Sequence, residues 1–203
     1  MSRLSFAGAA CAVWLAASPV AAEPFANFVD MCLRTDVDRQ AAGARAKAIG
    51  WYAMPIDAET ADESEMEDGA LFLSVDPMNV GDKGMPNDLE MLVTGWGSGE
   101  QVFDVGGVRM DACIIMTVAG GGDFAARLEE TLGFAPVDFD GEKAWAFSRV
   151  GAGFRSESDL LLALDEDPES LRTLANERKI YIAGVLEEDG LTGLMLAALR
   201  PGE

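Results

Sequence analysis

The apolar positions near the beginning of the chain repeat at the spacing of an α-helix. They fall at i, i+3, i+4, i+7 and i+8 and are Phe25, Phe28, Val29, Cys32 and Leu33. Such a stripe predicts a helix over residues 24–33 that packs one face against the core. Cys32 belongs to this stripe and is therefore expected to face inward.

A second helix is predicted over residues 40–48, which form an alanine-rich run. Thr35, followed three residues later by Asp38, has the form of a helix N-cap. At the other end, Gly50 is a candidate left-handed cap, and Trp51 is expected to dock just after it. The N-terminal part of the chain is therefore expected to be helical.

Apolar and β-branched runs separated by glycine-containing turns follow this helical region. They predict a mostly antiparallel sheet of seven or eight strands, and thus an α+β fold. Two further helices are expected, over residues 123–132 and after Asp167. The predicted strands cover residues 89–96, 101–105, 108–118, 135–139, 143–150, 179–187 and 191–199, and the short apolar runs over residues 70–75 and 160–164 are further strand candidates.

The second half of the chain contains the order strand, helix, strand, strand twice. The two units span residues 113–150 and 160–199, and each ends in a hairpin with an Asp-Gly turn, at 140–141 and at 189–190. A duplication would place both units in one sheet. Residue identity between them is negligible, and chance alternation of helices and strands gives the same order.

Residues 1–22 have the organisation of a secretory signal peptide. Arg3 provides the positive start, an uncharged apolar run follows, and Val20 and Ala22 place small residues before a cleavage site. Cleavage after Ala22 predicts a periplasmic or secreted protein with one globular domain of residues 23–203.

This leader has two other interpretations. It could be retained as a membrane anchor, although the apolar run is short. Cys11 could mark a lipoprotein, but Gly8-Ala9-Ala10 precedes it in place of a large aliphatic residue. Beyond the leader the sequence has no apolar run long enough for a transmembrane helix.

Cleavage after Ala22 would leave two cysteines, Cys32 and Cys113. An oxidising compartment favours a disulfide between them, and only one pairing is possible. The alternative is two buried free thiols, because both cysteines have apolar neighbours.

The first helix and the residues that close the helical region carry a resemblance. Residues 28–35, with Cys32 among them, and the pair Gly50-Trp51 resemble the beginning of a group of uncharacterised exported bacterial proteins. The resemblance covers a small part of the chain. It implies export and no particular activity.

The composition excludes several function classes. The chain has 35 acidic and 15 basic residues, a formal charge of −20, and no histidine. Such a charge opposes nucleic-acid binding, and without histidine there is no Ser-His-Asp or Cys-His system and no imidazole metal ligand. The charge favours a basic partner, although it could also serve solubility alone.

An acidic segment over residues 57–68 contains seven carboxylates and no base. A solvated loop is the plain interpretation. Weak calcium capture is the alternative, because Ca²⁺ prefers oxygen ligands, but the spacing does not match a twelve-residue calcium loop. The calcium candidates are Asp62, Glu63, Glu65, Glu67 and Asp68.

Catalytic motifs are weak. The glycines of residues 120–122 lack the lysine of a phosphate loop, and Asp123 would cap the helix that follows. Residues 95–99 do not have the spacing of a nucleophile elbow. One carboxylate pair, Asp138 and Asp140 near Trp145, lies beside an aromatic residue and more simply belongs to a hairpin. The methionines are scattered, which favours core packing over copper binding.

The sequence therefore favours a non-catalytic exported envelope protein that binds a basic partner, without a cofactor. Two alternatives stay open. One is a hydrolase that works through carboxylates or a divalent cation. The other is a small-ligand binder that uses the groove of a duplicated sheet.

Overall fold

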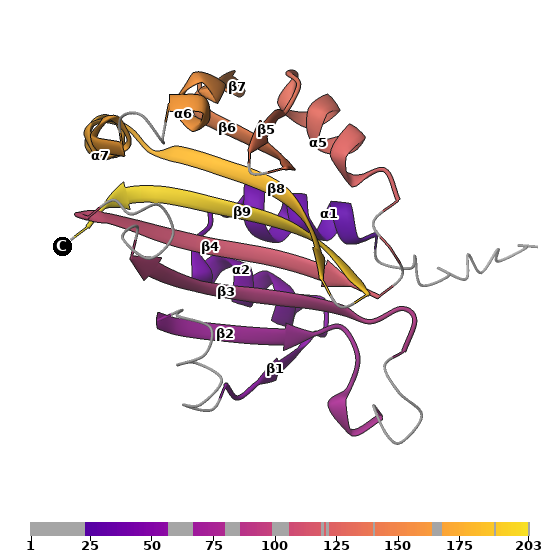
Figure 1. Cartoon of the computed structure of the whole chain (residues 1–203). Helices are drawn as coiled ribbons and strands as arrows, with labels where there is room; N and C mark the ends of the chain where they lie inside the picture. Colours follow the sequence, from indigo (N-terminus) through magenta and orange to yellow (C-terminus); the bar gives the residue numbers. More distant parts are fainter. Residues whose placement is uncertain are drawn as a thin grey trace, which may run out of the picture.

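The computed structural model describes residues 23–56, 67–79, 86–98, 106–118, 120, 122–139, 141–163, 168–188 and 190–202. The predicted signal peptide and most of the acidic segment lie outside these residues. The described strands form one nine-stranded sheet, shown in Figure 1, with every neighbouring pair antiparallel. The order is β1-β2-β3-β4-β9-β8-β6-β5, with β7 also paired to β6. The predicted α+β class is confirmed.

The strands are β1 (Tyr52–Met54), β2 (Glu67–Leu73), β3 (Glu90–Ser98), β4 (Val108–Thr117), β5 (Val137–Phe139), β6 (Glu142–Val150), β7 (Gly153–Ser156), β8 (Ile180–Glu188) and β9 (Leu191–Pro201). The helices are α1 (Pro24–Phe28), the π-helix η1 (Val29–Leu33), α2 (Arg39–Ala48), the 3₁₀ helix η2 (Pro77–Asn79), α5 (Phe124–Leu132), α6 (Ser158–Ala163) and α7 (Pro168–Glu177).

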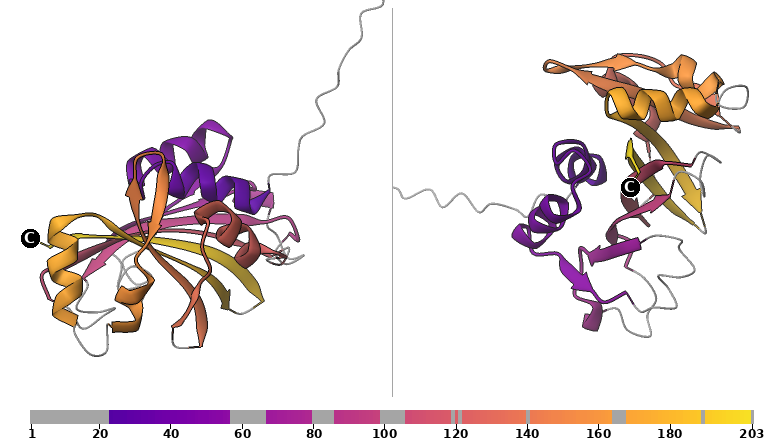
Figure 2. Two further views of the ribbon diagram at one scale, coloured as in Figure 1. Left: turned by 90° about the horizontal axis from the view of Figure 1, so that it is seen from above. Right: turned by 90° about the vertical axis from the view of Figure 1, so that its left-hand side faces the viewer.

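Helices cover parts of both faces of the sheet. The N-terminal helices and α5 contact one face, whereas α6 and α7 lie against the other (Figure 2). Two separate cores result from the alternation of side chains along each strand. In β4, Cys113 and Ile115 belong to the core under the N-terminal helices, and Val108 belongs to the core under α6 and α7.

The disulfide predicted between Cys32 and Cys113 is present. It joins η1 to β4, both cysteines are fully buried, and their Cα atoms are 5.5 Å apart. The bond therefore fixes the N-terminal helical layer to the centre of the sheet.

The N-terminal helical region differs in detail from the prediction. Residues 24–33 do not form one regular helix, because the chain widens into a π-helix in which the Arg34 amide donates to the Val29 carbonyl. This widening buries Met31 completely and leaves Val29 only partly buried. The inward stripe is otherwise as predicted.

The predicted N-cap at Thr35 is wrong. Asp38 caps α2 by accepting a hydrogen bond from the Ala41 amide at 2.7 Å, whereas the Thr35 hydroxyl bonds back to the Met31 carbonyl. Gly50 does adopt the left-handed conformation, with φ of 90°. The Trp51 amide then closes a Schellman motif on the Ala46 carbonyl.

The predicted strand over residues 160–164 is also wrong, since α6 occupies this segment as far as Ala163. Leu160 and Leu161 are both buried while Leu162 is 61% exposed, a pattern that a helix produces and an alternating strand does not. The two units of the second half therefore differ in structure, and the duplicated sheet is not supported.

The sheet has strands that the sequence analysis missed. These are β1 and β7, both short, and β3 continues through Ser98 where a turn was expected. The predicted strand over residues 101–105 lies outside the described residues. None of the described helices is both long enough and apolar enough to cross a membrane.

Candidate functional site

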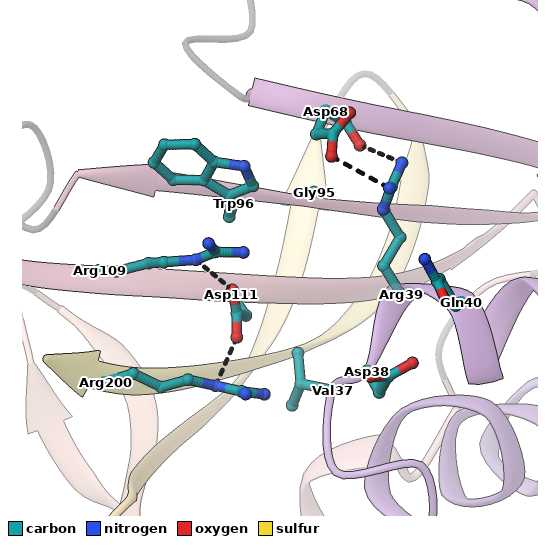
Figure 3. A pocket seen from close by; sticks show the side chains of 10 residues that line it. All are labelled: Val37, Asp38, Arg39, Gln40, Asp68, Gly95, Trp96, Arg109, Asp111 and Arg200. Atoms are coloured by element: carbon teal, nitrogen blue, oxygen red, sulfur yellow. Dashed lines mark hydrogen bonds and ion pairs between the residues drawn. The ribbon is translucent and has the colours of Figure 1, made fainter. Parts of the chain in front are cut away.

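A polar cavity of about 300 Å³ opens where β3, β4 and β9 meet the beginning of α2. Its side chains, shown in Figure 3, come from five separate segments. We call it the arginine cavity, because three guanidinium groups line it. The lining residues are Val37, Asp38, Arg39, Gln40, Asp68, Gly95, Trp96, Arg109, Asp111 and Arg200.

Strand register brings the central residues of the cavity together. Arg109 of β4 lies directly opposite Arg200 of β9, and Asp111 lies directly opposite Trp96 of β3. Residues two apart on a strand share a face, so all four side chains point to the side of the sheet that carries Cys113. The cavity therefore lies on the same face as the N-terminal helices.

Asp111 holds two of the arginines. Its Oδ1 accepts a hydrogen bond from Arg109 Nε at 2.8 Å, and its Oδ2 lies 2.5 Å from Arg200 Nε. The Asp111 side chain is only 10% exposed, whereas the two arginine side chains keep 40% and 34% of their surface exposed. One buried carboxylate thus pairs with two guanidinium groups and balances the charge of only one of them.

The third arginine comes from the first turn of α2. Arg39 Nη1 donates to the Asp68 carbonyl at 2.9 Å, and its Nη2 lies 3.0 Å from the Asp68 carboxylate. Asp68 has a φ of 56°, and the pairing of β2 with β3 shifts register between Glu67 and Ala70. Such a bulge redirects a side chain, here toward Arg39.

Trp96 provides a flat apolar wall. The Arg109 guanidinium lies over its ring at 4.5 Å from the ring centre. This cation–π contact limits the movement of Arg109, whose Nε is the atom that bonds Asp111.

A second charged cluster adjoins the cavity through Arg200. Arg200 Nη2 donates to the Asp36 carbonyl at 3.3 Å. The Asp36 carboxylate accepts hydrogen bonds from Lys179 and Tyr181, and Arg149 Nε lies 3.6 Å from it. These contacts connect the loop before α2 to β6, β8 and β9.

The backbone of this loop is strained. Asp36 and Val37 have φ values of 63° and 60°, and a β-branched residue such as valine rarely adopts this region. Each such residue costs on the order of 1–3 kcal/mol unless its surroundings hold it there. The Asp36 ion pairs and the hydrogen bond from the Val37 amide to the Cys32 carbonyl at 3.1 Å do so.

The contacts within this cluster shift the pKa values of Asp36 and Tyr181. Partial burial acts to raise the pKa of Asp36, but the hydrogen bonds from Lys179 and Tyr181 outweigh it, and the pKa is lowered. Burial, and then the Asp36 carboxylate, raise the pKa of Tyr181, so that its hydroxyl stays a donor.

One other carboxyl group is a candidate acid or base. Burial raises the pKa of Glu90, which is 4% exposed and accepts a hydrogen bond from Asn27 Nδ2 at 2.6 Å. Glu90 is not among the residues that line the arginine cavity. A lone carboxyl group held in this way suits a structural role at the contact between α1 and β3.

The calcium candidates of the acidic segment are only partly among the described residues. Asp62, Glu63 and Glu65 lie outside the described residues, and Glu67 and Asp68 begin β2. Within the described part of the chain, no group of three or more acidic or cysteine side chains could hold a metal ion. The described residues therefore give the calcium alternative no support.

The contacts of Asp138 agree with the hairpin interpretation, whereas the predicted cap of α5 needs correction. Asp138 accepts a hydrogen bond from the Gly141 amide at 3.0 Å, as a hairpin residue does, and Asp140 lies outside the described residues. Trp145 is fully buried and donates to the Phe134 carbonyl. Asp123 occupies the N-cap position of α5 but makes no capping hydrogen bond with its side chain.

Sequence reasoning missed the arginine cavity. One signal was available: Arg109 and Asp111 are spaced by two on a predicted strand, which places opposite charges on one face. Arg200 and Arg39 reach the same point only through the sheet order and the bulge at Asp68. Comparison of the chain with protein-family models, curated proteins and solved structures found no match.

Proposed function

We propose that this chain is an exported, non-catalytic binding protein whose arginine cavity holds an anionic group of a small ligand. The signal-peptide pattern of residues 1–22 and the disulfide between Cys32 and Cys113 favour export to an oxidising compartment. The sequence analysis placed a small ligand in the groove of a duplicated sheet, whereas this proposal places it in the arginine cavity.

One observation carries this proposal: two guanidinium groups share one buried carboxylate. Arg109 and Arg200 both pair with Asp111, both line the cavity, and each keeps more than a third of its side-chain surface exposed. Guanidinium groups bind carboxylate and phosphate groups through paired N–H donors, so an anion at this point would satisfy the donors that Asp111 does not. The volume suits a small ligand, at the lower end of ordinary binding pockets.

Titration calorimetry of the oxidised protein with acetate, succinate, inorganic phosphate and glucuronate tests the proposal. We expect at least one of these anions to bind. Arg109→Gln and Arg200→Gln should each weaken that binding about tenfold or more, because a charged hydrogen bond contributes about 1.5–3 kcal/mol.

Arg34→Gln is the matched control. Arg34 is a 66% exposed arginine whose ion pair joins it to Asp30, away from the cavity. Its replacement should leave anion binding unchanged. Failure of all four anions to bind at millimolar concentration, or equal loss in Arg34→Gln, would contradict the proposal.

Capture of a basic partner is the second candidate. Every arginine that the structure describes is ion-paired within the chain, and the chain has 35 acidic against 15 basic residues, so its negative charge stays in excess. A surface of this kind attracts basic proteins at long range. Pull-down from an envelope extract at low salt, followed by mass spectrometry, tests it, and absence of any retained basic protein would count against it.

A further inference from the structure

A second cavity, of about 330 Å³, lies on the opposite face of the sheet from the arginine cavity. It is bounded by the β5–β6 hairpin, by α6 and by the middle of β8 and β9. We call it the apolar cleft. Its walls are mainly the side chains of Met110, Phe139, Leu161, Ile182, Leu186 and Met195.

The cleft is hollow because the residues of its floor are small. Ala144 of β6 pairs with Gly184 of β8, and Ala197 of β9 lines the same cleft. A Cβ atom on Gly184 would lie 3.8 Å from the Lys143 carbonyl oxygen and 3.9 Å from Met195 Cε, which is ordinary van der Waals contact. The backbone therefore does not require glycine here, and the missing side chain leaves open volume.

The mouth of the cleft combines an aromatic ring with a carboxylate. Phe139 and Glu142 are directly opposite each other in the β5–β6 hairpin, so their side chains point to the same face of the sheet. No ion pair joins Glu142 to another residue in the described part of the chain. Alternation along β6 places the Lys143 side chain on the other face, and its carbonyl is what approaches the floor.

An aromatic face beside a carboxylate attracts an organic cation. The ring offers its negative face to an ammonium group, and the carboxylate offers a full opposite charge. Apolar walls behind this pair favour an apolar body on the same molecule. The formal charge of −20 also raises the local concentration of small cations around the protein.

We infer that the apolar cleft binds a small organic ammonium ion, with its apolar body over Gly184 and its cationic group between Phe139 and Glu142. An apolar cavity of about 150 Å³ holds benzene, so a cleft of twice that volume accommodates roughly a dozen heavy atoms. This site is independent of the arginine cavity, since it lies on the other face and selects the opposite charge.

Three ligands with one eight-carbon body and different head groups test the inference: octylamine, octanol and octanoate. They are titrated below their micellar concentrations at pH 7 into the oxidised protein. We expect octylammonium to bind at least fivefold more tightly than octanol, and octanoate to bind most weakly. Glu142→Gln should remove most of the preference for octylammonium over octanol and leave only the part that the Phe139 ring and the net charge contribute.

Gly184→Leu should fill the cleft and weaken all three ligands tenfold or more. Gly153→Leu is the matched control, because Gly153 is exposed on β7, away from the cleft, with only the Val150 carbonyl oxygen near its Cβ position. Near-ultraviolet circular dichroism checks that each variant is folded. If Gly184→Leu does not fold, the head-group series and Glu142→Gln decide the question by themselves.

Three results would overturn the inference. One is equal binding of octylammonium and octanoate, and another is full binding by a folded Gly184→Leu protein. The third is a dimer that sedimentation velocity detects in the unmodified protein and that Gly184→Leu dissociates, because the cleft would then be an interface between two copies. None of these results bears on the arginine cavity, whose test uses different ligands and variants.

Discussion

Asp36 is the residue on which the loop before α2 depends most. Its carboxylate contacts Lys179, Tyr181 and Arg149, although its own φ is positive. Asparagine tolerates the same backbone region, so Asp36→Asn removes the charge with little backbone penalty. We expect the free energy of unfolding at pH 7 to fall by about 1 kcal/mol, a value kept small because the Asp36 side chain is 44% exposed.

The pH dependence of that loss has a definite sign. The pKa of Asp36 is lowered below its ordinary value of 3.8, so its stabilising contribution is complete above that value and disappears as the pH falls through the lower folded-state pKa. The difference between the two proteins in urea unfolding should therefore vanish at the acid end. Asp88→Asn, at an exposed turn, should show no loss at any pH. A loss that persists at pH 2 would mean that the ion pairs are not its cause.

The contribution of Glu90 to stability should have the opposite pH dependence. Its pKa is raised from 4.5 by burial, so its contribution is complete below that value and is lost as the pH rises through the folded-state pKa. Glu90→Gln stays neutral at every pH and can still accept the hydrogen bond from Asn27. Its melting temperature should exceed that of the unmodified protein at pH 8 and match it at pH 4. Glu130→Gln, on the exposed surface of α5, is the control.

Among the elements, those with strong local signals were predicted well. The β8–β9 hairpin follows from its Asp-Gly turn, and α5 ends at Gly133, whose φ is 84°. Elements whose structure depends on packing against residues distant in sequence were not predicted well. Residues 160–163 form a helix because Leu160 and Leu161 both reach the core under α6 and α7, and a short apolar run does not reveal this.

Gly50 gives a clean test of an element boundary. Its φ of 90° ends α2, and no other heavy atom lies within 4 Å of its Cβ position. Gly50→Ala should therefore cost about 1 kcal/mol of unfolding free energy through backbone strain alone. Gly106→Ala also meets open space, but Gly106 does not have a positive φ, and it should be neutral or slightly stabilising. Equal effects of the two changes in urea unfolding would refute this account of the helix end.

The disulfide connects two elements that are 81 residues apart in sequence. Reduction, or replacement of both cysteines by serine, should lower the free energy of unfolding by about 2–5 kcal/mol, because the unfolded chain regains the freedom of a long loop. Urea unfolding with and without reductant measures this loss. Non-reducing mass analysis should show two hydrogens fewer than the reduced protein has. Two freely titrating thiols in the folded protein, purified without reductant, would show that the bond does not form.

For the whole molecule, the distribution of charge could not be predicted from the totals. The sequence gives a strong excess of acids, and that excess suggested a basic partner. The sheet order then brings Arg109 and Arg200 together from strands distant in sequence, and the bulge at Asp68 adds Arg39. Three guanidinium groups thus gather in one cavity of an acidic protein, beside three aspartates that line the same cavity. Only the tertiary structure determines which charged residues come together, because neighbours on adjacent strands are not neighbours in sequence.

Binding of an anion in the arginine cavity and binding of a basic partner by the acidic protein should respond to salt in opposite ways. At low ionic strength the net charge repels an anionic ligand before it reaches the arginine cavity, and salt screens this repulsion as the Debye length falls to about 10 Å at 0.1 M. The repulsion is stronger for a ligand with two negative charges than for a ligand with one. Chloride ions also compete for the arginines, but this competition slows two ligands of similar structure equally. The association rate of succinate relative to that of its monomethyl ester should therefore rise between 20 and 200 mM sodium chloride, by about twofold.

Stopped-flow tryptophan fluorescence measures both rates, since Trp96 lines the cavity. A lysine-rich peptide provides the opposite case, and its association should slow over the same range if the acidic surface steers basic partners. A ratio for the two succinates that stays flat or falls would mean that the local field of the three arginines governs approach to the cavity. The net charge would then serve solubility or partner capture on other faces of the molecule, and it would not control access to this site.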